Sequence, residues 1–168
     1  MYKDHLLQGM ERELILLKRM AVLIEEKDLE FRPFDKTRNT IELMRYLSGL
    51  GAVMMRWYVV NDWNKEEWEK IAAYRSTLTI ENFPARIDEQ IEAIKAYMNM
   101  ITEDDLLNKE VEMPNKEKMA LGAAIINGPV KWLATYRMQL FNHLKMNGRP
   151  DLATKDAWPA INASSPAA

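Results

Sequence analysis

The chain has 168 residues, of which 48% are hydrophobic and 29% are charged, and its formal net charge is −2. This length suits one ordinary domain, and the composition is that of a globular protein rather than a disordered one. The basic residues are scattered among acids, so the sequence gives no clustered basic face of the kind that nucleic-acid binding needs. With no cysteine in the sequence, disulfides, cysteine-ligated zinc and thiol nucleophiles are excluded.

The apolar stretches are too short for a membrane protein, since none reaches the roughly 18 residues that a membrane-spanning helix needs. Acidic residues near the N-terminus and the pair Lys18-Arg19 also interrupt the first apolar stretch, which a secretory signal would not tolerate. We therefore expect a cytoplasmic protein with no membrane partner.

Two amphipathic helices are predicted in the first part of the chain. One runs from about Lys3 to Lys27, and its apolar residues recur every three or four positions. The next begins at Asn39, whose side chain is expected to cap the first turn while Glu42 reaches back to it, and it runs to about Asn61. The apolar stripes of these two helices are Leu7, Met10, Leu14, Leu17, Ala21 and Ile24, then Leu43, Tyr46, Leu47, Leu50, Met54 and Trp57.

Two more helices are predicted in the second part. The third runs from about Ile80 to Ile101 with apolar residues spaced by four and three. The fourth runs to about Asn147, and Gly148 is a suitable C-terminal stop. Because proline lacks the backbone N–H and clashes with the preceding turn, Asn127-Gly128-Pro129 should kink or restart this last helix.

Four such helices can bury their apolar stripes only against one another, and no stretch has a strand pattern of useful length. We therefore predict an all-α four-helix bundle in a single domain, residues 1–160, followed by a flexible C-terminal tail, residues 161–168. The segment 62–79 between the second and third helices is long and carries a short helical pattern of its own. A helix of ~22 residues is ~33 Å long, and ~17 extended residues reach ~55 Å. This crossover permits an up-down-down-up bundle.

Three motifs stand out along the chain. They are Phe31-Arg-Pro-Phe-Asp35 before the second helix, Glu42-Leu43-Met44-Arg45-Tyr46-Leu47 within it, and Trp132-Leu-Ala-Thr-Tyr136-Arg137-Met-Gln139-Leu140 followed by Gly148. Taken in this order, they resemble the DinB/YfiT-like proteins, a superfamily of proposed metalloenzymes that includes metal-dependent thiol transferases and isomerases. The resemblance covers roughly residues 1–150 and implies a four-helix bundle with up-down-down-up topology that assembles as a homodimer.

The metal ligands of that family are missing from this sequence. The resemblance places three histidines at the positions that Tyr46, Trp132 and Tyr136 occupy here. An indole N–H is only a donor, and a tyrosine binds a metal as phenolate, which its reference pKa of ~10 disfavours. We therefore predict that the three aromatics fill the pocket and that no metal or cofactor binds there. A simpler interpretation, that they are ordinary core aromatics, predicts the same absence of metal.

Four polar residues remain as candidates around this pocket. The resemblance retains Arg137 and Gln139, which could support the pocket wall or join two helices. His143 lies two turns beyond Tyr136, whereas His5 lies in the first turn of the first helix. These positions are at opposite poles of an up-down-down-up bundle, so we expect two partly exposed histidines rather than a rebuilt metal site.

Three functions stay open at this point. The one we favour is a metal-free DinB-like bundle, not an enzyme, that binds a small molecule or a protein partner. The second is an enzyme of the thiol-transferase type that uses a displaced metal or none. The third is a purely structural interaction module. The sequence identifies neither a ligand nor a catalytic residue.

Overall fold

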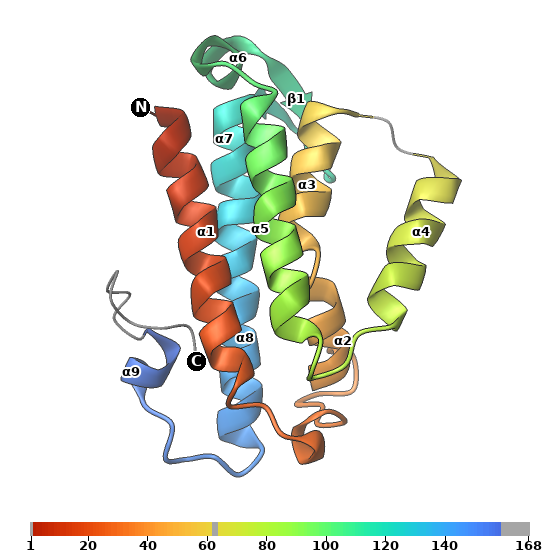
Figure 1. Cartoon of the computed structure of the whole chain (residues 1–168), viewed down its shortest axis with the longest axis vertical. Coiled ribbons are helices and arrows are strands. Elements are labelled where there is room, and N and C mark those ends of the chain that lie inside the picture. The colour runs from red at the N-terminus through yellow and green to blue at the C-terminus, as the bar shows by residue number, and fades with distance from the viewer. Residues whose placement is uncertain (1, 62–63, 159–168) are drawn as a thin grey trace.

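The computed structural model describes residues 2–61 and 64–158. The predicted tail 161–168 lies outside these residues. Helices form most of the described chain and stand side by side as a bundle (Figure 1). The longest elements are α1 (Tyr2–Ala21), α2 (Thr40–Leu47), α3 (Leu50–Val59), α4 (Lys65–Ser76), α5 (Phe83–Asn99) and α8 (Lys131–Met146).

Shorter elements join these helices, and one pair of them forms a β-hairpin. The prediction of a largely helical protein is confirmed, but the all-α class was too strict, because β1 and β2 pair antiparallel with Val111 opposite Met119. Strands of three residues are too short to give a readable alternation. The shorter elements are η1 (Glu26–Asp28), α6 (Glu103–Asn108), β1 (Glu110–Glu112), β2 (Lys118–Ala120), α7 (Leu121–Ile125), η2 (Ile126–Val130) and α9 (Thr154–Ala157).

The start of α2 follows its predicted local chemistry. The Asn39 side chain accepts a hydrogen bond from the Glu42 backbone N–H at 2.9 Å, and the Glu42 carboxylate accepts one from the Asn39 N–H at 2.9 Å. This reciprocal pair confirms the predicted capping box. The preceding helix is shorter than predicted: α1 ends at Ala21 rather than at Lys27, and η1 follows it.

The second predicted helix is divided into α2 and α3 at Gly49, whose backbone is not helical (φ −146°, ψ 6°). A buried glutamine from α5 holds this break. Gln90 accepts a hydrogen bond from the Gly51 N–H at 2.6 Å and donates one to the Leu47 carbonyl at 3.0 Å. Both backbone groups lie at the helix ends, where an intrahelical partner is missing. The division of the helix therefore depends on Gln90, which lies 39 positions after Gly51 in the sequence.

The predicted kink before α8 is confirmed. The chain passes from α7 to α8 through the π-helical turn η2, in which Gly128 has non-helical angles (φ −100°, ψ −105°) and Pro129 follows. A Cβ at position 128 would lie 2.7 Å from the Tyr58 hydroxyl, closer than any side chain tolerates. Glycine is therefore needed here for close approach. Because proline has no backbone N–H, Pro129 cannot donate a helical hydrogen bond, and this opens the turn.

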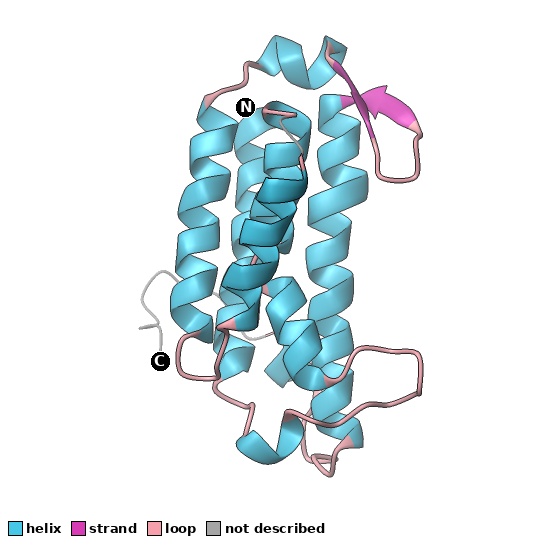
Figure 2. Cartoon of the chain, turned by 90° about the vertical axis from the view of Figure 1, so that its right-hand side faces the viewer, coloured by secondary structure: helices cyan, strands magenta, loops and turns pink. Residues whose placement is uncertain are grey.

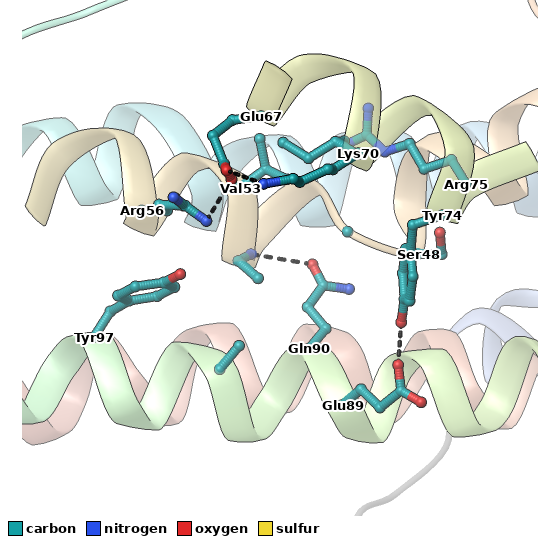
Figure 3. Close-up of a pocket in the computed structure, with 14 residues that line it drawn as sticks. Ser48, Val53, Arg56, Glu67, Lys70, Tyr74, Arg75, Glu89, Gln90 and Tyr97 are labelled. Carbon is teal, nitrogen blue, oxygen red and sulfur yellow. Dashed lines mark hydrogen bonds and ion pairs between the residues drawn. The ribbon is translucent and has the colours of Figure 1, made fainter. Parts of the chain in front are cut away.

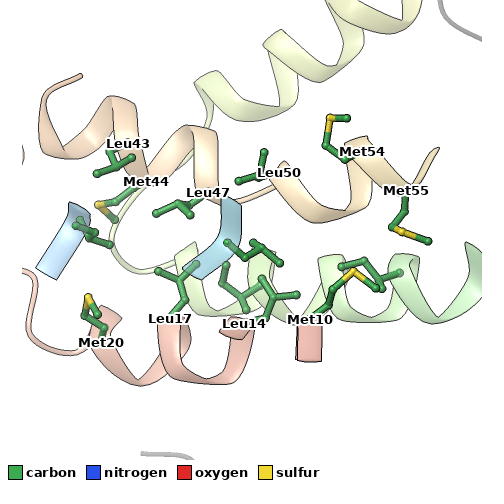
Figure 4. Packing of buried hydrophobic residues seen from close by; sticks show 14 of the residues in the cluster. Met10, Leu14, Leu17, Met20, Leu43, Met44, Leu47, Leu50, Met54 and Met55 are labelled. Atoms are coloured by element: carbon green, nitrogen blue, oxygen red, sulfur yellow. The ribbon is translucent and has the colours of Figure 1, made fainter. Parts of the chain in front are cut away.

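The core lies between α1, α2, α3, α5, α7 and α8. Figure 4 shows methionine and leucine side chains of α1 facing those of α2 and α3 across this interior. Met10 and Leu14 of α1 and Leu43 of α2 are fully buried. The apolar stripes read from the sequence thus become contacts between helices.

The helix α4 stands apart from this core. In Figure 1 the chain descends along α1, ascends along α2 and α3, descends along α4, ascends along α5, and descends again along α7 and α8. The view in Figure 2 faces α4, which lies outermost on its side of the bundle. No residue of α4 is buried.

Among the described residues, no helix combines the length and the apolarity that crossing a membrane requires.

Candidate functional site

The structure brings Tyr46, Trp132 and Tyr136 together from α2 and α8. The two tyrosine rings pack edge to face, with centroids 5.0 Å apart and an interplanar angle of 76°. Trp132 lies one turn before Tyr136, and it lines the same cavity as Tyr46. All three side chains are half-buried. The positions that the family resemblance assigns to metal ligands therefore form an aromatic cluster.

Tyr46 and Trp132 line a cavity rather than fill it. The cavity, called the aromatic cavity below, measures about 380 Å³. Trp57 of α3 and Trp68 of α4 add two more aromatic walls, and their ring centroids are 6.3 Å apart. The prediction of a plugged pocket was too strong, because α4 closes the site from outside and leaves space beneath it. The lining residues are Tyr46, Leu50, Val53, Met54, Trp57, Trp68, Arg75, Pro114 and Trp132.

Two arginines flank Tyr46. The Arg38 guanidinium lies 4.1 Å from the centroid of the Tyr46 ring, and the Arg75 guanidinium lies 5.4 Å from it. In the described ranges 2–61 and 64–158, neither arginine forms an ion pair with a carboxylate, and the Arg75 Nε is buried without a hydrogen-bond partner. Burial, and then the nearby Arg38 charge, lower the pKa of Arg75. Arg75 is thus a half-buried cation without a counter-ion from this part of the chain.

The residues at the three family positions do not fit a divalent metal. Burial first, and then Tyr136, raise the pKa of Tyr46, so its hydroxyl is held in the neutral form. Trp132 offers no lone pair, and Arg75 beside Tyr46 would repel a cation. Elsewhere in the described chain, no group of three or more His, Asp or Glu side chains is placed to hold a metal ion.

A second cavity lies between α3, α4 and α5 and measures about 500 Å³ (Figure 3). We call it the α4 cleft. Its apolar walls come from small and aliphatic residues on all three helices, and Val53 and Arg75 border this cleft and the aromatic cavity alike. The lining residues are Ser48, Gly49, Ala52, Val53, Arg56, Glu67, Lys70, Ile71, Tyr74, Arg75, Glu89, Gln90, Ala93 and Tyr97.

Most charged groups of the α4 cleft are already paired. Glu67 receives Arg56 Nη1 at 3.0 Å on one carboxylate oxygen and Lys70 Nζ at 3.0 Å on the other. Glu89 accepts a hydrogen bond from the Tyr74 hydroxyl (Figure 3). This cleft was not predicted from the sequence, because the segment that forms α4 was interpreted as a connection between two helices. A signal was present in Trp68, Ile71 and Arg75, which recur at spacings of three and four on one side of that short helix.

Arg137 and Gln139 lie away from both cavities. Arg137 is fully buried, and its Nε donates to Glu13 of α1 at 2.8 Å while its Nη1 donates to the Ala157 carbonyl at 2.7 Å. Its guanidinium also lies 4.0 Å from the ring centroid of Trp158. Gln139 is half-buried and lines neither cavity. Arg137 therefore joins α8 to α1 and α9 and does not support the pocket wall.

The two histidines lie at opposite ends of the bundle, near the start of α1 and the end of α8 (Figure 1). His5 is exposed, but the expectation of partial exposure was wrong for His143, which is 1% exposed. The His143 Nδ1 lies 3.2 Å from the Thr40 hydroxyl, and its Nε2 is buried without a partner. Burial lowers the pKa of His143, so the ring is held neutral as part of the core.

Comparison with known proteins gives one solved structure of similar shape. No protein-family model and no curated protein matches the sequence. The crystal structure of a proposed DinB-family member from Exiguobacterium sibiricum 255-15 superposes with a TM-score of 0.69 and 15% sequence identity, covering 90% of this chain and 95% of that chain. The fold is DinB-like. This likeness confirms the resemblance that the motifs suggested, and at this identity it speaks for the fold alone.

Proposed function

We propose that this DinB-like bundle binds a small organic molecule in the aromatic cavity and does so without a metal. One observation carries the proposal: Tyr46 and Trp132, at two of the family's ligand positions, are walls of a cavity of about 380 Å³ together with Trp57 and Trp68. Ligand pockets commonly span about 300–1,000 Å³ and are mostly apolar with a few polar groups.

The chemistry of the walls favours a planar, apolar ligand. Indole and phenol rings bury large surfaces and stack in offset or edge-to-face arrangements. Burial raises the pKa of Tyr46, so its hydroxyl stays neutral at neutral pH and adds a polar, uncharged group, hydrogen-bonded to Tyr136, to the wall. Arg75 adds a cationic group at the border of the cavity. Such a site selects by shape and stacking rather than by coordination.

The test uses 2-naphthol, a neutral aromatic probe, with titration calorimetry and thermal unfolding. We expect saturable binding and a rise in melting temperature, because the probe binds the native state. Trp132→Ala and Trp68→Ala should each weaken binding about tenfold, which corresponds to about 1.4 kcal/mol. Phe34→Ala, which removes an aromatic ring that is 69% exposed and outside the cavity, should leave the affinity unchanged. Equal binding by the wild type and Trp132→Ala would reject the proposal.

The alternative of an enzyme with a displaced metal is tested separately. We expect elemental analysis of protein purified without added metal to find far less than one transition-metal ion per chain. About one nickel, zinc or iron per chain, lost on His143→Gln or His5→Gln, would instead favour a thiol-transferase type of enzyme. No cofactor is part of the proposal.

We also propose that residues 1–160 form one domain with up-down-down-up order, with α4 in the crossover. The directions of the helices in Figure 1 support this order. The resemblance further implies a homodimer, while the charge pattern and the apolar stretches of the sequence favour a cytoplasmic protein without a nucleic-acid partner. Light scattering coupled to size-exclusion chromatography tests the assembly: we expect twice the mass of a 19.6 kDa chain. A monomer at micromolar concentration would contradict the dimer.

A further inference from the structure

We propose that the α4 cleft is a second ligand site, which takes an alkyl carboxylate such as a medium-chain fatty acid. The carboxylate would lie on Arg75, and the hydrocarbon chain would lie between α3, α4 and α5. This goes beyond the binding of an aromatic molecule in the neighbouring cavity, since it uses a different space and a different class of ligand.

The need for an anion comes from Arg75. Its Nε is buried without a hydrogen-bond partner, and no carboxylate of the described residues pairs with it. Its Nε and Nη2 lie 3.7 and 3.8 Å from where a Cβ would stand on Gly49, so the guanidinium rests against a backbone that has no side chain. Burying a cation without a counter-ion is unfavourable. A carboxylate matches the planar guanidinium through two parallel hydrogen bonds.

The other charges of the cleft do not meet this need. Glu67 is engaged by Arg56 and Lys70, and Glu89 accepts from Tyr74. The lining thus holds two carboxylates and three cations, with Arg75 as the cation that neither carboxylate contacts. A ligand with a single negative charge would balance the lining. The cleft also attracts anions rather than cations on approach.

The walls of the α4 cleft favour an apolar body for the ligand. Ala52, Val53, Ile71 and Ala93 make the surface between the charged ends apolar. Gln90 crosses this surface, but both ends of its amide are already bonded to the backbone at Gly51 and Leu47 and need no ligand. In Figure 3, Arg75 and Tyr97 stand at opposite ends of the cleft. A chain of methylene groups fits an elongated apolar space that has a cation at one end.

The first experiment titrates the full-length protein with hexanoate, octanoate and decanoate below their micelle concentrations. We expect Kd to fall about fourfold for each added methylene until the cleft is full, because burying each CH₂ contributes a constant increment. Octanol, which has the same chain length as octanoate and no charge, should bind at least about tenfold more weakly. Equal affinity for octanol and octanoate would overturn the role of Arg75.

The second experiment uses paired variants, each checked for its fold by circular dichroism. Arg75→Gln should weaken octanoate binding at least about tenfold, whereas Arg12→Gln, on an exposed arginine of α1, should not. Ala93→Leu should abolish binding by filling the cleft. Ala96→Leu, on an exposed alanine of the same helix, should bind octanoate as the wild type does.

The outcomes separate this site from the aromatic cavity. Loss of octanoate binding in Trp132→Ala, with wild-type binding in Ala93→Leu, would move the carboxylate ligand into the aromatic cavity and reject the α4 cleft as its site. No binding of any carboxylate by the wild type would also reject the inference. In either case the result with 2-naphthol decides the proposal for the aromatic cavity independently.

Discussion

The helices α1 and α4 are packed in opposite ways. α1 buries seven of its residues, and Met10 and Leu14 have no exposed surface at all. α4 buries none, and Trp68 and Tyr74 keep 43% and 39% of their surface exposed. The first helix is held by apolar burial, which is the main source of folding free energy. The comparison indicates that apolar burial and the two cavities belong to different parts of this bundle.

The contacts that hold α4 are polar and aromatic. Glu67 pairs with Arg56, Trp68 packs on Trp57, and Arg75 lies over Tyr46. Ion pairs near the surface contribute only about 0–1 kcal/mol each. We infer that α4 opens from the bundle at lower free energy than the core unfolds. Both cavities lie under this weakly held helix, so their access and their stability are set by α4.

The largest effect is expected from Leu14→Ala. This side chain is fully buried in α1, so its truncation leaves a cavity and should destabilise the protein by about 3 kcal/mol. Urea denaturation measures the change. The matched control is Leu107→Ala, at an exposed leucine of α6, which should cost less than about 0.5 kcal/mol. A cost below about 1 kcal/mol for Leu14→Ala would contradict the assignment of α1 to the core.

The next effect concerns the break between α2 and α3. Gln90→Leu removes both partners of the Gly51 N–H and the Leu47 carbonyl in a buried site, so we expect a loss of about 2 kcal/mol. Gln139→Leu serves as the control, because Gln139 is only half-buried and should change the free energy of unfolding by less than about 0.5 kcal/mol. If the two variants were equally stable, the break would not depend on Gln90.

A pH-dependent effect is expected from His143. Burial lowers its pKa in the folded protein below the unfolded value of about 6.5, so the unfolded chain binds the proton first as pH falls. This contribution to stability is therefore complete above about pH 6.5 and is lost as pH falls through the folded pKa. Urea midpoints at a series of pH values should fall less steeply in His143→Gln than in the wild type. His5→Gln should keep the wild-type slope; parallel curves for all three proteins would refute the prediction.

The smallest effect on stability is expected in α4. Trp68→Ala should lower the free energy of unfolding by less than about 1 kcal/mol, because this side chain is largely exposed. Hydrogen exchange should show the α4 amides exchanging much faster than those of α1 in the wild type, and faster still in the variant. Equal protection of α1 and α4 would remove the contrast between the two helices.

Local chemistry determined much of what the sequence predicted correctly. The capping box at Asn39 and Glu42 and the kink at Gly128-Pro129 arise among neighbouring residues, and both were legible without a structure. The apolar stripe through Leu14 was legible for the same reason, since a period of 3.6 residues places its members on one face. These features determine that the protein is largely helical and which face of each helix is apolar.

Only the tertiary structure decided that the second predicted helix divides at Gly49 and that two cavities remain beside α4. The division at Gly49 depends on Gln90 from α5, and the hairpin is too short to leave a pattern. The burial of His143 and the bonds by which the buried Arg137 joins α8 to α1 and α9 depend on neighbours that are distant in sequence. The two cavities exist because Arg75 and Trp68, in a segment expected to be a connection, lie over α2 and α3. A cavity is a relation between surfaces that meet only on folding, so no local period or spacing in the sequence can encode its volume.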